Sequence, residues 1–200
     1  MNNLAVRRRI PREVLAGGMI KGTMMAAHVK WATTDRAAPD LLRFWNALPP
    51  EVAKPLKSMI LPVTFYEFAH LIAVDHAIVK AYAGGDIRVL RDVGAYSARV
   101  NLTGVYKVYR RDSIHAFLEG SARMHLKFQD FGVAAYARTG PTSGDMLLSE
   151  YCSYSPLFCE SAIGFYREAL AIHGGQSVHV NETSCQCFGE PRCTFAISWQ

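Results

Sequence analysis

All five cysteines of this chain lie in its last quarter, and their positions restrict how that part can fold. Cys159 stands in the first turn of a predicted helix, whereas Cys185 and Cys193 lie on the two arms of a predicted hairpin at the C-terminus. A helix N-terminus stabilises a thiolate, because its free backbone N–H groups and its dipole favour negative charge. A metal ion bound by these three thiolates would tie the helix to the hairpin.

The remaining cysteines leave the choice of ligands open. Cys187 is separated from Cys185 by a single residue, so both side chains point to the same side of an extended strand. Cys152 lies at the end of the preceding predicted strand. An odd number of cysteines in a chain expected to be cytoplasmic favours thiols or metal ligands over disulfides. Buried free thiols are the alternative to a metal site, and the spacing alone does not single out a fourth ligand.

The spacing of apolar residues predicts an α+β fold. Strands are predicted where the apolar runs are short and bounded by turn residues. The sheet is expected to be antiparallel, with about four to five strands covered by helices. Within the helix that starts after Thr64, Glu67 has the spacing of a capping box. The predicted helices cover residues 39–48, 51–59, 65–82, 86–102 and 157–173, with one more beginning at Asp112 or Ser113, and the predicted strands lie within 17–31 and over 130–138, 144–151, 177–187 and 192–199.

Length and charge are those of an ordinary globular chain. With 200 residues, we expect a single domain over residues 1–200. Much of the net charge of +5 comes from arginines at positions 7–9 and 12, so residues 1–15 are predicted to form a flexible basic arm, and nucleic acid is not an expected partner. The N-terminus lacks the apolar segment of a secretory signal, and no stretch has the roughly 18 uncharged apolar residues of a membrane span. We therefore expect a cytoplasmic protein.

The C-terminal segment from Cys159 to Trp199 contains the run N-E-T-S-C-Q-C-F-G-E-P-R-C-T-F-A-I-S-W. It resembles the C-terminal signature of 4-vinyl-reductase-like domains, which is a helix cysteine followed by E-x2-C-x7-C and an aromatic and apolar strand. The whole chain is also similar to uncharacterised myxobacterial proteins of about the same length, through residues 20–22, Leu61-Pro62 and residues 94–98. The resemblance implies a homodimer with a fold related to TRAPP vesicle-tethering subunits, in which helices cover a small antiparallel sheet.

The resemblance also implies the ligands of the metal. Cys159 corresponds to the helix cysteine, Glu182 and Cys185 to E-x2-C, and Cys193 to the last cysteine. Three thiolates and a carboxylate form a closed tetrahedral set that suits zinc, within a zinc-site region over residues 152–199. We expect zinc as the cofactor and expect its role to be structural, because four protein ligands leave no open position to activate water.

Aromatic side chains of the helices indicate a ligand cavity beside the sheet. Its candidate lining residues are Tyr106, Phe117, Phe128 and Tyr166, and ordinary core packing is the alternative. The sequence contains no phosphate-binding loop or nucleophile elbow, and no catalytic residue is singled out. We therefore expect a non-enzymatic sensory module that binds a small apolar or aromatic ligand. The rival hypotheses are a dimerising TRAPP-like adaptor that serves an unknown protein partner, and a reductase or thiol redox enzyme.

Overall fold

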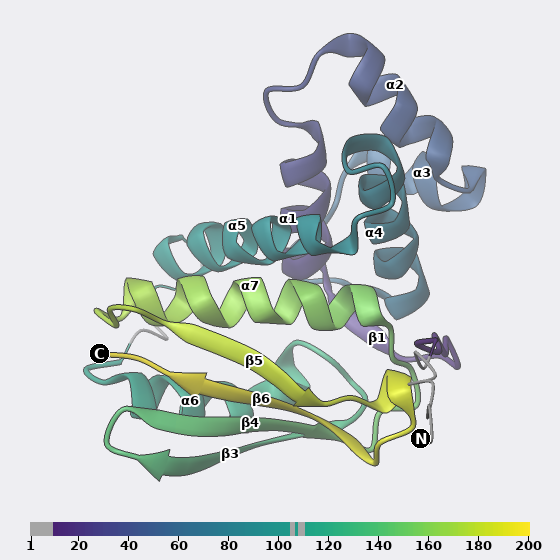
Figure 1. Cartoon of the computed structure of the whole chain (residues 1–200). Coiled ribbons are helices and arrows are strands. Elements are labelled where there is room, and N and C mark those ends of the chain that lie inside the picture. The colour runs from purple at the N-terminus through teal and green to yellow at the C-terminus, as the bar shows by residue number, and fades with distance from the viewer. Residues whose placement is uncertain (1–9, 105–106, 108–110) are drawn as a thin grey trace, which may run out of the picture.

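The computed structural model describes residues 10–104, 107 and 111–200 (Figure 1). This part of the chain contains seven α-helices, a two-stranded sheet and a four-stranded sheet. The predicted α+β class is therefore confirmed. In chain order the elements are β1 (Met19–Lys21), α1 (Gly22–Thr33), α2 (Ala38–Ala47), α3 (Pro50–Ser58), β2 (Phe65–Glu67), α4 (Phe68–Tyr82), η1 (Ile87–Val89), α5 (Leu90–Thr103), α6 (Ile114–Arg123), η3 (His125–Lys127), β3 (Val133–Gly140), β4 (Ser143–Ser149), α7 (Pro156–Ile172), β5 (His179–Ser184), η4 (Gln186–Phe188) and β6 (Arg192–Ser198).

The four-stranded sheet has the order β3-β4-β6-β5, and all of its neighbours are antiparallel. Its two outer pairs are the two hairpins predicted from the sequence. Alternate residues of the central strands are buried, as expected for a sheet with one covered face: Met146 of β4 pairs with Phe195 of β6, and both are fully buried. The helices α6 and α7 pack on the sheet, α6 against β3 and α7 against β5.

Helix α7 links the sheet to the rest of the molecule (Figure 1). It begins where Ser155 caps it, because the Ser155 Oγ accepts a hydrogen bond from the backbone N–H of Leu157 at 3.2 Å, and Pro156 occupies the first helical position. One side of α7 covers the sheet, and α5 packs closely along it. Buried apolar residues from Ile20 to Trp199 form one core cluster that includes helices and sheet.

One predicted element and one predicted boundary are wrong. The strand predicted within residues 17–31 is mostly helix α1, because this segment is rich in methionine and alanine, which favour helices. Only Met19–Lys21 is extended, and it pairs with β2. The helix predicted from residue 65 begins at Phe68, since Phe65–Glu67 forms this strand pair, and no side chain caps the helix. A pairing across more than forty residues of sequence therefore overrides the local capping-box pattern.

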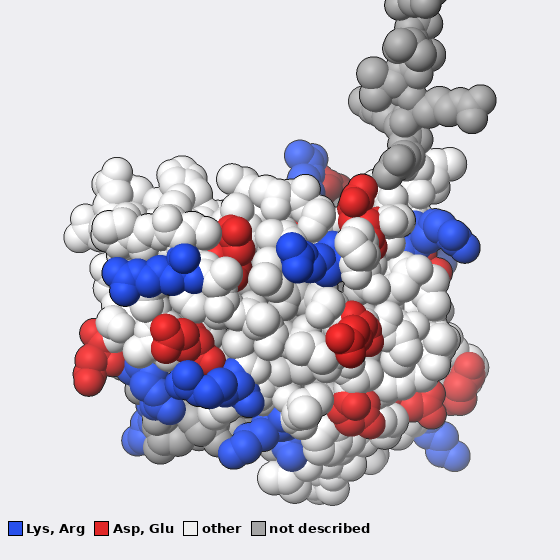
Figure 2. All heavy atoms as spheres, turned by 90° about the horizontal axis from the view of Figure 1, so that it is seen from below, with Lys and Arg blue, Asp and Glu red and all other residues white. Residues whose placement is uncertain are grey.

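The N-terminal segment is described only from residue 10, so most of the predicted basic arm lies outside the described residues. Closer to the core, the backbone N–H of Arg12 donates to the Cys187 carbonyl, and Val14 pairs with Tyr154. On the face seen from below, basic and acidic side chains are interspersed (Figure 2). Among the described helices, none combines the length and the apolar character that crossing a membrane requires.

Candidate metal centre and ligand cavity

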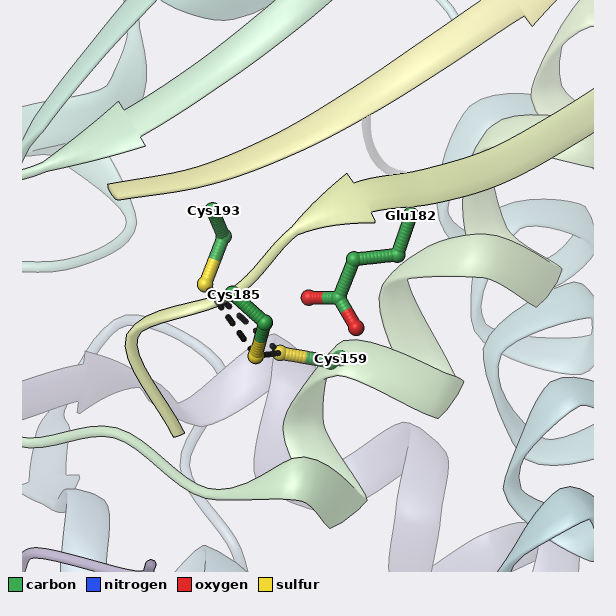
Figure 3. Close-up of side chains that lie close together, drawn as sticks. All are labelled: Cys159, Glu182, Cys185 and Cys193. Atoms are coloured by element: carbon green, nitrogen blue, oxygen red, sulfur yellow. Dashed lines mark hydrogen bonds between the residues drawn. The ribbon is translucent and has the colours of Figure 1, made fainter. Parts of the chain in front are cut away.

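Three cysteine side chains converge between the start of α7 and the β5–β6 hairpin (Figure 3). Cys159 lies in the first turn of α7, Cys185 follows β5, and Cys193 lies in β6. The Sγ of Cys159 is 3.7 Å from that of Cys185 and 3.9 Å from that of Cys193, and the last two are 3.7 Å apart. A disulfide requires about 2.05 Å, so these are separate thiols that share one buried space.

The carboxyl group of Glu182 completes the cluster. It projects from β5 toward the three sulfur atoms (Figure 3), and the four ligand atoms all lie within 4.8 Å of one another. The Oε1 atom of Glu182 is buried without a hydrogen-bond partner, which is costly unless a further group satisfies it. Cys187 is buried and Cys152 is exposed, and both lie outside this group of four.

The electrostatics of the cluster are those of crowded acidic groups. Burial raises the pKa of Glu182 to about 8. Hydrogen bonding with Cys185 raises the pKa of Cys159 well above its usual value, while the hydrogen bond from Cys159 lowers the pKa of Cys185. One thiolate therefore suppresses ionisation of its neighbours. A divalent cation reverses this balance, because it stabilises all of the deprotonated ligands together.

A cavity of about 170 Å³ lies between α1, α5, α6 and α7. Phe117, Phe128 and Tyr166, which were expected to line a pocket, all contribute to its wall. Tyr106, the fourth expected residue, lies outside the described residues. The exposed wall area is mostly apolar, which is typical of sites for small organic ligands.

Two buried histidines also line this cavity. The Nδ1 of His28, in α1, lies 2.6 Å from Oδ1 of Asp75, a fully buried residue of α4. The Nε2 of His125, which follows α6, lies 2.9 Å from the carbonyl oxygen of Phe131, to which it donates. Burial lowers the pKa of His125, so its ring is held in the neutral form at neutral pH.

The sequence matches no family model and no curated protein. Solved structures do match. An H-NOX protein from S. oneidensis in the Fe(II)NO ligation state has a TM-score of 0.67 at 14% sequence identity, over 90% of this chain and 99% of that chain. The fold is H-NOX-like. The Fe(II) unliganded H-NOX protein from K. algicida has a TM-score of 0.65 at 8% identity, over 90% of this chain and 97% of that one. A structure described as probing heme distortion in the H-NOX family has a TM-score of 0.62 at 14% identity, over 90% and 95% of the two chains.

The H-NOX-like fold corrects the family assignment made from the sequence. The expected 4-vinyl-reductase-like domain with a TRAPP-like fold is wrong, as is the grouping with myxobacterial proteins that accompanied it, since the likeness to H-NOX structures extends over 90% of the chain. The C-terminal motif covers a helix and a hairpin only. A cysteine-bearing helix that precedes a hairpin is a local arrangement, and different folds can share it.

The histidine–aspartate pair was missed at the sequence level. His28 and Asp75 are 47 residues apart, and they meet because α1 and α4 pack together. A signal was present: each stands at helical spacing between buried apolar residues. His28 lies between Met25 and Ala32, and Asp75 lies between Ile72 and Val79. Polar residues at such positions are buried, and buried polar groups need partners. The sequence shows the need for a partner but not its identity.

Proposed function

We propose that this protein is a non-enzymatic sensory module with an H-NOX-like fold, in which Cys159, Glu182, Cys185 and Cys193 hold a structural zinc ion. The observation that carries the zinc site is the spacing of the sulfur atoms, 3.7, 3.7 and 3.9 Å. Tetrahedral zinc with Zn–S bonds of about 2.3 Å places its sulfur ligands about 3.8 Å apart. The unpartnered oxygen of Glu182 supplies the fourth position.

The role assigned to zinc is mechanical. Four protein ligands close the coordination sphere, so the ion has no position at which to activate water. The ion joins the N-terminal turn of α7 to the β5–β6 hairpin, and the middle of α7 carries Ser161, Phe165 and Tyr166 into the cavity wall. The backbone N–H of Gln186 donates to the Cys193 sulfur at 3.4 Å, which supports a thiolate at that position. Zinc thereby holds one wall of the ligand cavity in place.

The sensory part of the proposal rests on the cavity and on the fold. Similar structures are described as an H-NOX protein in an Fe(II)NO ligation state and as a study of heme distortion in the H-NOX family; the first description names a ligation state and the second a heme. The adaptor hypothesis depended on the TRAPP-like fold and falls with it. The enzyme hypotheses lack a cofactor-binding motif or a nucleophile elbow in the sequence, so the sensory hypothesis is the one that we propose.

Heme itself does not fit the cavity as it stands. The chemistry of the donors is suitable, because His125 is a neutral buried imidazole and imidazole is a common iron ligand. The cavity is too small for heme. Its volume is about 170 Å³, whereas pockets for drug-sized ligands have volumes of about 300–1,000 Å³, and heme is at least as large as such a ligand. We therefore derive no function that passes through heme.

Metal analysis tests the zinc site directly. Protein purified without added zinc should contain close to one zinc ion per chain by plasma mass spectrometry. The variant Cys193→Ser should lose the metal and melt at a lower temperature, because structural zinc contributes folding free energy. Cys152→Ser is the matched control, since Cys152 is exposed and outside the cluster, and it should keep both.

Two further variants test the choice of ligands. Glu182→Gln should lower zinc affinity, whereas Cys187→Ser should leave zinc content unchanged because Cys187 lies outside the group of four. Zinc that is absent from the native protein would contradict the proposed site altogether. Zinc that is lost from Cys187→Ser but retained in Glu182→Gln would show that a fourth cysteine, and not the carboxylate, binds the metal.

A further inference from the structure

The histidine of the His28–Asp75 pair lies in the cavity wall, and its second ring nitrogen, Nε2, is held only by a long hydrogen bond. Asp75 is fully buried, and its Oδ1 engages Nδ1 of His28 at 2.6 Å. This contact fixes the imidazole ring and leaves Nε2 on the side of the cavity wall. The Nε2 atom shares a hydrogen bond of 3.4 Å with the Ser161 Oγ, which is longer than the usual 2.7–3.2 Å. A ligand that approaches Nε2 more closely could therefore replace a weak hydrogen bond by a stronger one.

A second polar group of the wall is also unsatisfied. Gln129 is 6% exposed, and its Nε2 is buried without a hydrogen-bond partner. Its Oε1 accepts only a long bond, 3.4 Å, from the Tyr151 hydroxyl. Gln129 lines the same cavity as His28 and Ser161. A buried amide that lacks a partner costs free energy, which a polar group of a bound ligand would recover.

Size and shape limit the ligand. The cavity volume of about 170 Å³ is close to the engineered cavity of about 150 Å³ that binds benzene. Aromatic rings of Phe117, Phe158 and Phe165 form much of the wall, and they favour offset or edge contacts with another ring. One six-membered ring with a small substituent therefore fills the space.

We propose that the cavity binds a neutral, ring-sized molecule that carries a hydroxyl group, and that His28 Nε2 and Gln129 Nε2 recognise its polar end. A hydroxyl both donates and accepts hydrogen bonds, so it pairs with the imidazole nitrogen in either protonation state and also accepts from the amide. This inference rests on the proposed function and specifies its ligand class: a small aromatic or cyclic alcohol in place of heme.

Phenol, toluene and hemin are the probes that test this proposal on the zinc-loaded protein. Phenol and toluene have nearly the same shape but differ in the hydroxyl. Phenol should bind about tenfold or more tightly than toluene, the effect of one buried hydrogen bond together with the cost of leaving its partner unpaired. Thermal shift and calorimetric titration give the two affinities. In ¹⁵N-detected imidazole spectra, phenol but not toluene should move the Nε2 resonance of His28.

Gly120 provides a variant that closes the cavity without removing a polar group. It lies in α6, lines the cavity, and a Cβ added there would meet no atom within 4 Å. Gly120→Leu should therefore fill the space and abolish phenol binding while the protein keeps its zinc and its helical circular dichroism. Gly120→Ala adds a single carbon and is the matched control; it should still bind phenol.

Each outcome has one meaning. Equal affinity for phenol and toluene would overturn recognition by His28 and Gln129, although a ligand cavity would remain. A Soret band with hemin that disappears in Gly120→Leu would overturn the small-ligand proposal in favour of heme. Failure of all three probes to bind would also overturn it. The zinc site of the proposed function is tested by a different measurement, the metal content. Failure of the zinc proposal can therefore be distinguished from failure of the ligand proposal.

Discussion

The close contact between α5 and α7 depends on two glycines, Gly94 and Gly164, and its response to alanine can be worked out from the structure. A Cβ built on Gly94 of α5 would lie 1.9 Å from the backbone oxygen of Ser161 in α7. A Cβ built on Gly164 of α7 would lie 1.8 Å from the backbone oxygen of Arg91 in α5. Real carbon–oxygen contacts are well above 3 Å, and backbone atoms cannot move without moving their helix.

The substitution Gly164→Ala therefore sets two effects against each other. Alanine in a helix interior is more favourable than glycine by about 1 kcal/mol. Overpacking of a filled interior typically costs about 1–3 kcal/mol, and occasionally more. Because the obstacle at Gly164 is backbone, we expect a cost at or beyond the upper end and a net loss of about 2 kcal/mol. For a chain of this length, about 2–4 °C per kcal/mol gives a melting temperature lower by about 4–8 °C.

Gly120→Ala is the matched control, since Gly120 is also a buried residue within a helix. Its added Cβ meets no atom within 4 Å, so only the helix-propensity gain remains, about 1 kcal/mol of stabilisation. Urea unfolding at constant zinc loading, followed by far-UV circular dichroism, measures both variants. If Gly164→Ala stabilises the protein as Gly120→Ala does, the close α5–α7 contact is refuted.

Three other properties can be measured on the same protein. Burial lowers the pKa of His125, so its contribution to stability is complete above the unfolded-state pKa of about 6.5 and is lost as pH falls through the lower pKa of the folded state. Urea unfolding of the native protein at several pH values should show this loss of stability in acid, and His125→Gln should weaken it. Ser155→Ala removes the cap of α7 and a 2.5 Å hydrogen bond to Glu13, so it should lower the free energy of unfolding by about 1–2 kcal/mol. Thermal melting measures this, and an unchanged melting temperature would show that the cap does not stabilise α7. Light scattering after size exclusion tests the predicted homodimer, and a mass of one chain at micromolar concentration would contradict it.

Much of the secondary structure could be predicted because its cause is local. The helices corresponding to α2, α3, α5, α6 and α7 follow from apolar residues at helical spacing, and the hairpins follow from short runs around turn residues such as Gly189, which has the left-handed backbone that glycine favours. The grouping of Cys159, Cys185 and Cys193 could be predicted for the same reason. A hairpin brings its two arms together, and Cys159 starts the helix that precedes it.

The family could not be determined from the C-terminal motif, because a motif of one helix and one hairpin does not specify how α1 to α5 pack on them. Only the tertiary structure decided that Met19–Lys21 pairs with Phe65–Glu67, and that α1 and α4 bring His28 to Asp75. These contacts join residues more than forty positions apart, so each depends on the free energy of the whole core and not on local preference. The sequence by itself determined most of the helices, the two hairpins and the place where the thiols gather, because these depend on local patterns, and the packing of the helices decided the fold and the cavity.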